Sequence, residues 1–196
     1  TLEVFNKLGI DMGVGVAIPQ YQDLSFKIDI PGTKYGRFSI FGIGGLSYIE
    51  LHDSEKEEGD NSSAYEMGGV DLDFGSDMGV VGFSHLYFLN EKTRIKTTLS
   101  VLGTQTTTKI DSLLFDDAGA ILANSNYLFY HGITTENKYS LSARLSKKYN
   151  SKNNVAYGFV YDFYQINYLD SAYKYETDAF ERNFDLEGNL QLLKAF

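Results

Sequence analysis

The chain has 196 residues, of which 43% are hydrophobic and 15% aromatic, so it can bury a core as one domain of ordinary size or as two small ones. Its net charge of −9 argues against the concentrated Lys and Arg of a nucleic-acid-binding surface. It contains no Cys, which excludes a disulfide framework, a Cys-ligated zinc site and a thiol nucleophile. No apolar run reaches the roughly 20 residues of a membrane-spanning helix, which excludes a helical membrane protein but not every membrane protein.

Hydrophobic side chains alternate with polar or small ones along most of the chain. Ile10, Met12 and Val14 alternate with Asp11 and Gly13, and the pattern recurs at 24–30, 138–146, 155–163 and 183–192. Successive side chains of a strand point to opposite faces, so this pattern indicates strands with one apolar face. No segment has a sustained helical period. The sequence therefore predicts an all-β protein.

Turn residues divide the chain into eight predicted strands. The predicted strands are 8–18, 22–30, 34–51, 76–90, 93–112, 137–149, 153–169 and 182–196. Several are much longer than the 5 or 6 residues at which strands of soluble proteins peak. A tilted strand that crosses a membrane needs about 9–11 residues. The lengths therefore favour strands that cross a membrane and extend beyond it.

The connections between the last six predicted strands alternate in length. Tight turns are predicted at 90–92 and 150–153, whereas the links near 52–75, 113–136 and 170–181 are long and polar. Short periplasmic turns and long extracellular loops are typical of outer-membrane barrels. We therefore predict an antiparallel up-and-down transmembrane β-barrel in the cell outer membrane. Its long loops are expected to contact a substrate.

If the apolar face meets lipid, the opposite face lines a lumen. The polar side chains assigned to this lining are Lys138, Arg144, Lys148, Asp162, Asp185, Glu187, Asn189 and Gln191. These residues suit a wet or polar-plugged interior. Their mixed signs indicate no selectivity for anions or cations.

The sequence contains no recognisable metal or phosphate site. His52, His85 and His131 lie far apart, without metal-ligand spacing. The acidic residues of 53–60 and 71–73 lack the ligand order and glycine of an EF-hand. Three glycines, Gly42, Gly44 and Gly45, precede no helix. They indicate a bend or a close approach of strands rather than a phosphate loop.

A hydrolase site is not predicted either. Ser84 precedes His85, but adjacent strand residues face opposite sides and no carboxylate is placed to complete a triad. We therefore predict that the chain is not an enzyme and holds no catalytic residue, no metal and no cofactor. Substrate-binding residues are left unassigned.

Four stretches carry a resemblance to a known family. They are Ala17–Lys27, Gly36–Gly45, Gly75–Gly82 and Asn137–Asn150. These stretches resemble TonB-dependent receptors of the Bacteroidetes, in particular those whose chains begin with a carboxypeptidase-regulatory-like domain. Such receptors have a plug domain followed by a barrel of 22 strands, and they import scarce nutrients with energy relayed from the inner membrane.

The resemblance implies that the chain is the early part of such a barrel. Residues 1–33 would form the plug–barrel junction and the first short strands, and 34–196 would form barrel strands with long extracellular loops. The implied partners are the lipid bilayer, a small-molecule or oligomeric nutrient, a surface lipoprotein, and TonB through a plug region outside this sequence. The resemblance supplies no site residue and no nucleic-acid partner.

Two alternatives stay open. A complete eight-stranded barrel with a structural or adhesive role is favoured by the even strand count and by Phe196, since barrels commonly end in an aromatic residue. Pro19 and Pro31 oppose it, because they split the first two segments as a junction would. The other alternative is a soluble β-barrel that binds a small apolar ligand.

Overall fold

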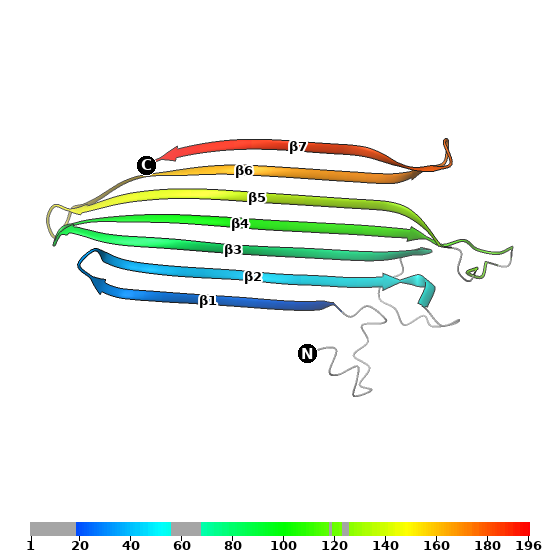
Figure 1. Cartoon of the computed structure of the whole chain (residues 1–196), viewed down its shortest axis with the longest axis horizontal. Helices are drawn as coiled ribbons and strands as arrows, with labels where there is room; N and C mark the ends of the chain where they lie inside the picture. The colour runs from blue at the N-terminus through cyan, green and yellow to red at the C-terminus, as the bar shows by residue number, and fades with distance from the viewer. Residues whose placement is uncertain (1–18, 56–67, 118, 123–125) are drawn as a thin grey trace, which may run out of the picture.

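The computed structural model describes residues 19–55, 68–117, 119–122 and 126–196. They form one seven-stranded sheet with a short 3-10 helix (Figure 1). Its elements are β1 (Gln20–Thr33), β2 (Gly36–His52), η1 (Asp53–Glu55), β3 (Val70–Asn90), β4 (Thr93–Ser112), β5 (Tyr127–Lys148), β6 (Asn154–Lys174) and β7 (Ala179–Ala195).

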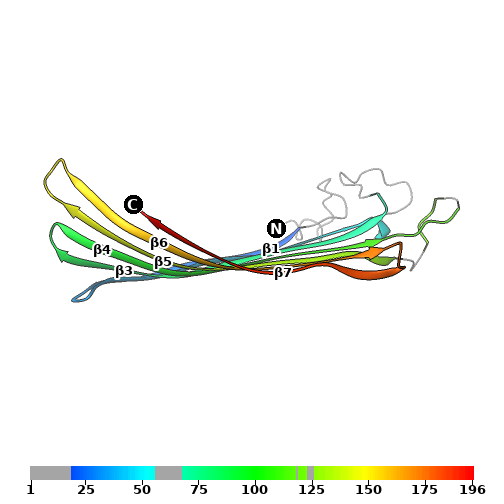
Figure 2. The same ribbon diagram turned by 90° about the horizontal axis from the view of Figure 1, so that it is seen from above.

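The strands follow one another across the sheet in chain order, and each pair of neighbours is antiparallel. The prediction of an all-β, antiparallel up-and-down arrangement is therefore confirmed. Figure 2 shows the described strands as a single twisted layer. The sheet is open, because β1 and β7 lie at its two edges and do not pair with each other.

Asparagine side chains shape two of the short turns. The Asn90 side-chain oxygen accepts the backbone N–H of Lys92 at 3.0 Å. The Asn150 oxygen accepts the N–H groups of Lys152 and Asn153 at 2.9 and 2.8 Å. Asn stabilises turns in this way because its side chain replaces a backbone acceptor. Both turns were predicted at these residues and are confirmed.

Several strands extend into the predicted long links. The links at 53–69 and 113–126 are shorter than the predicted 52–75 and 113–136, and the predicted link at 170–181 is wrong, since only 175–178 connects β6 to β7. Polarity suggested loops there, but polar residues do not end a strand whose backbone ladder continues. Asp170 still pairs with Gly132 of β5 and Phe184 of β7.

The first described strand tolerates a proline. Pro31 lies within β1, near the register shift between Ile30 and Thr33. Because β1 is an edge strand, the missing N–H of proline removes no ladder bond on its open side. Pro31 therefore does not end β1: Pro31 and Gly32 have no partner in the register with β2, and pairing resumes where Thr33 stands opposite Gly36. The predicted strand at 8–18 lies outside the described residues.

Two glycines allow aromatic rings to lie across the sheet. Gly42 stands opposite Phe26, and a Cβ at Gly42 would lie 2.5 Å from the Phe26 ring. Gly82 stands opposite Phe41 and is covered by its ring in the same way. The sequence predicted a bend or a close approach of strands at Gly42, whereas the structure has an aromatic side chain lying over this glycine, and Gly82 shares that arrangement.

The described sheet buries almost no apolar side chain. Leu113, 5% exposed, is the buried hydrophobic residue of the described chain, and no large side chain there is fully buried. A single layer cannot cover its own faces. Apolar residues on either face must therefore be covered by something other than the described chain.

Candidate functional site

The strand register assigns each side chain to one of two faces, because paired residues project to the same side. We call the face that carries Leu99 and Leu141 the leucine face, and the face that carries Ser140 and Ser142 the serine face. We call the end of the sheet with turns 34–35, 91–92 and 149–153 the short-turn end. The other end is the long-link end.

An apolar band crosses all seven strands on the leucine face, in the half nearest the short turns. The large apolar members of this band are Leu24, Phe26, Ile28, Ile30, Phe38, Ile40, Val81, Phe83, Tyr87, Ile95, Leu99, Val101, Tyr139, Leu141, Leu145, Val155, Tyr157, Phe159, Tyr161, Phe163 and Leu193. Leu99 is 50% exposed and Val81 56%. An exposed patch of this extent marks an interaction surface.

The height of the band matches the core of a bilayer. On β6 it runs from Val155 to Phe163, which is about 30 Å along a strand at about 3.3 Å per residue. A strand tilted by about 40° spans about 23 Å of membrane over that length, close to the roughly 25 Å apolar band of outer-membrane barrels.

The serine face at the same level is mostly polar, with Phe41, Leu86, Val160 and Leu192 as apolar members. Its side chains include Lys27, Asp29, Arg37, Ser39, Ser84, Lys96, Thr98, Ser100, Lys138, Ser140, Ser142, Arg144 and Asp162. Ser140 donates a hydrogen bond to Asp162 at 2.6 Å, and Lys138 lies 3.4 Å from the same carboxylate. Asp162 is only 4% exposed. Its charge is therefore compensated from two neighbouring positions.

The ion pair between Lys138 and Asp162 predicts that Lys138 contributes more to stability than Lys96, another lysine on the same face. Lys138→Met should lower the free energy of unfolding by about 1–2 kcal/mol, because the buried Asp162 carboxylate loses its nearest cation and keeps the hydrogen bond from Ser140. Lys96→Met on the same face is the control, since no carboxylate of the described chain pairs with Lys96. Denaturant unfolding of the purified protein checks this. Equal losses in both variants would contradict it.

Both faces change polarity at mid-strand. On β6 the leucine face continues from Phe163 to Gln165 and Asn167, while Ile166 and Tyr168 lie on the serine face. Near the long links, the leucine face is therefore polar and the serine face more apolar. The sequence shows that the apolar positions of a strand change from one alternate set to the other. Only the register shows that neighbouring strands change at the same level of the sheet.

This reversal corrects the predicted lumen lining. The serine face carries four of the predicted lining residues, Lys138, Arg144, Lys148 and Asp162. Asp185, Glu187, Asn189 and Gln191 of β7 lie on the leucine face instead, opposite Leu169, Asn167, Gln165 and Phe163. Alternation separates the two faces of one strand, but it cannot tell which face of one strand continues which face of the next.

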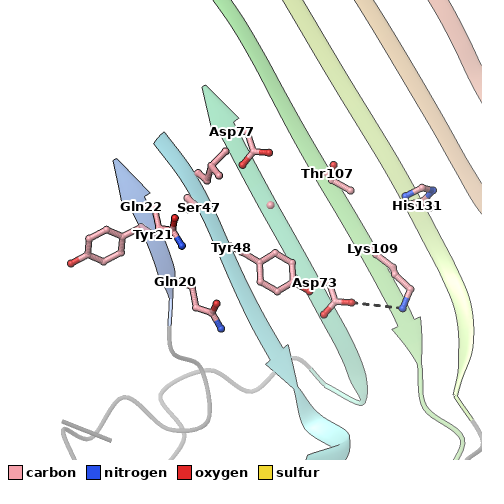
Figure 3. A pocket seen from close by; sticks show the side chains of 12 residues that line it. Gln20, Tyr21, Gln22, Ser47, Tyr48, Asp73, Asp77, Thr107, Lys109 and His131 are labelled. Atoms are coloured by element: carbon pink, nitrogen blue, oxygen red, sulfur yellow. Dashed lines mark ion pairs between the residues drawn. The ribbon is translucent and has the colours of Figure 1, made fainter. Parts of the chain in front are cut away.

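A polar hollow lies on the sheet near the long links (Figure 3). Lys109 is 2.5 Å from the Asp111 carboxylate and 3.7 Å from that of Asp73. The hydrogen bond with Asp111 raises the pKa of Lys109, against the opposing effect of burial. Burial, helped by Asp73, raises the pKa of Tyr48 to about 12. Lys109 therefore stays charged and Tyr48 stays neutral at physiological pH.

The three histidines have separate local roles. His52 Nε2 lies 2.8 Å from the Asp73 carboxylate. His85 donates from Nε2 to the Tyr35 carbonyl at 2.7 Å and stacks on Phe38 at 4.5 Å between ring centroids. His131 lines the polar hollow. The described residues contain no group of three or more His, Asp or Glu placed to hold a metal ion.

Two other sequence candidates have structural contacts. Asp71 accepts hydrogen bonds from the Ser54 N–H at 3.0 Å and the Ser54 hydroxyl at 2.7 Å, and Asp53 accepts one from the Gly69 N–H at 2.9 Å. These carboxylates thus tie the start of the 53–69 link to its end. The acidic residues 57–60 lie outside the described residues. Ser84 and His85 lie on opposite faces, as predicted.

Comparison with protein-family models, curated proteins and solved structures finds no match to this chain. Among the described residues, no helix is long and apolar enough to cross a membrane.

Proposed function

We propose that this chain is part of the wall of an outer-membrane β-barrel, and that the whole protein is a TonB-dependent receptor that imports a nutrient. The apolar band of the leucine face supports the first part of this proposal, that the chain belongs to the wall of a membrane barrel. It is continuous over seven strands and has the height of a bilayer core. Its charged member, Lys147, stands opposite Val155 at the short-turn edge of the band. Lipid acyl chains are the covering that such a band requires.

The serine face supports the lumen side of the proposal. At the level of the band it presents hydroxyl and charged groups, which are costly against lipid but suit water or a polar plug. A soluble barrel that held a small apolar ligand would need an apolar interior on one face. Neither face of this sheet is apolar along its full length.

The open edges support a barrel larger than the described sheet. β1 and β7 run in the same direction, because six antiparallel pairings connect them across the five strands between. Closing β1 directly onto β7 would create a parallel pair, whereas outer-membrane barrels of bacteria have an even number of antiparallel strands. More strands must therefore complete the wall. The resemblance to TonB-dependent receptors accounts for them with a barrel of 22.

The proposed receptor would present its long links, 53–69 and 113–126, to the outside and its short turns to the periplasm. The lumen would hold a plug from another part of the protein. The nutrient would reach the plug past the polar long-link end of the sheet. The chain itself would perform no chemical step.

The intact mass of the native protein, extracted from membranes with detergent, tests this proposal. A mass several times the 22.0 kDa of this chain is expected for a receptor of which the chain is a part. A mass near 22.0 kDa in the detergent fraction would instead support a small closed barrel and would overturn the transporter. Recovery at 22.0 kDa without detergent would overturn the membrane assignment itself.

A further inference from the structure

Each of the three turns at the short-turn end carries an exposed lysine. Lys34 lies in the turn between β1 and β2, Lys92 between β3 and β4, and Lys152 between β5 and β6. Lys147 and Lys148 follow at the end of β5 and are also exposed. Glu91 is the acidic residue of these turns. The short-turn end, directly beside the apolar band, is therefore basic in a chain whose net charge is −9.

These lysines lie close enough to one another to attract the same layer of anionic groups. The backbone N–H of Lys148 donates to the carbonyl of Lys92 at 2.8 Å, which joins the end of β5 to the turn between β3 and β4. Strands lie about 4.8 Å apart, so turns two strands apart are separated by about 10 Å. That distance is comparable with the Debye length at physiological ionic strength, and the lysines share one positive field.

No carboxylate of the described chain pairs with these amines. The ion pairs of the described residues involve Lys27, His52, Lys109, Lys138 and Arg182. At the long-link end, by contrast, Lys109 and Arg182 each lie 2.5 Å from an aspartate. The turn lysines thus keep their full charge available for an external anion.

Tyrosines place two of these amines at an apolar–polar boundary. Lys34 Nζ lies 4.9 Å from the centre of the Tyr35 ring, and Lys147 Nζ lies 4.9 Å from that of Tyr149. Both rings are exposed. Tyrosine suits the level of lipid headgroups, because its ring is apolar and its hydroxyl is wet. The cation beside each ring adds a group that attracts phosphate.

We propose that the short turns bind the phosphates of anionic phospholipid headgroups in the leaflet at this edge of the apolar band. The inference rests on the proposed membrane location and adds the chemical class of lipid. Lys92 and Lys152 are the residues to substitute, because both are exposed and, unlike Lys34 and Lys147, neither amine lies over an aromatic ring of the described chain. The sheet would thus be fixed in depth by acyl chains on its band and by headgroups at its turns.

Native mass spectrometry of the detergent-extracted full-length protein tests the proposal. Phosphatidylglycerol and phosphatidylcholine are titrated separately, and the wild type is expected to bind the former more tightly. A surface lysine contributes about fivefold to binding of an anionic lipid, so Lys92→Gln with Lys152→Gln should weaken phosphatidylglycerol binding by about 25-fold. Phosphatidylcholine binding should not change. The matched control is Lys174→Gln with Arg182→Gln at the long-link end, which should leave both affinities unchanged.

The outcomes separate this inference from the proposed function. Wild-type protein that is recovered from membranes but binds both lipids equally would overturn the headgroup assignment while leaving the barrel intact. Equal losses in the turn variant and the control would overturn it too, because the effect would then be one of net charge. Unchanged lipid binding with weaker binding of a polyglutamate peptide would assign the turns to an acidic protein. Recovery of the protein without detergent would instead be a failure of the proposed function.

Discussion

Leu99→Arg is expected to lower the stability of the protein in a bilayer by about 2–4 kcal/mol, the cost of a cation at the midplane on the lipid side of a barrel. Leu99 lies at the centre of the apolar band on β4, between Phe83 and Leu141 of the neighbouring strands. It is half exposed in the sheet alone, so the cost arises from the surroundings of the band rather than from lost packing.

Thr98→Arg provides a matched control one residue away. Thr98 lies on the serine face between Ser84 and Ser142, where an arginine can remain hydrated. Its substitution should change stability by less than about 1 kcal/mol. Denaturant unfolding from phospholipid vesicles measures both effects. The fraction of each variant that assembles into membranes gives a second reading if Leu99→Arg fails to fold. Equal tolerance of arginine at 98 and 99 would contradict the membrane proposal.

Gly36→Ala is expected to cost about 3 kcal/mol, because it combines backbone strain with a collision. Gly36 has a φ of 105°, which side chains of L-residues rarely adopt. A Cβ at this position would overlap the carbonyl oxygen of Leu86, and backbone on the neighbouring strand cannot move aside as a side chain can. The turn between β1 and β2 would have to change its path.

Gly79→Ala separates this effect from a general cost of replacing glycine. Gly79 lies in β3 without a positive φ, and no atom lies within 4 Å of a Cβ built there. Alanine at this position should be neutral or stabilising by about 0.5–1 kcal/mol. The difference in the unfolding midpoints of the two variants checks this. Two variants of equal stability would show that the turn at 34–35 adapts without strain.

The two faces of the sheet have different roles in the proposed receptor. The leucine face meets lipid near the short turns and water near the long links, and the serine face has the reverse order of polarity. A wall that extends well beyond the bilayer requires such a change on its outer face, because its upper half is surrounded by water. The long strands, such as the 22 residues of β5, provide that extension.

Local chemistry was sufficient to predict much of the fold. Alternation identified the strands, and asparagines at 90 and 150 marked two turns, because both signals depend on residues close in sequence. The boundaries near 170–181 could not be predicted from polarity. There the strands continue because their backbones pair with neighbours, and the sequence of one strand does not contain the ladder bonds of the next.

For the candidate surface, too, some features could be predicted from the sequence and others depended on strand pairing. The sequence by itself determined that each strand has an apolar and a polar side, that the sheet is antiparallel up-and-down, and that the tight turns at 90–92 and 150–153 contain Lys92 and Lys152. Only the tertiary structure decided which side of each strand lies on the leucine face and which lies on the serine face. It placed Asp185 to Gln191 of β7 on the leucine face, and it aligned the apolar stretches of seven strands into one band. Side-chain alternation has a period of two along a strand, so a shift of one residue between strands reverses every assignment. Register is a property of pairs of strands.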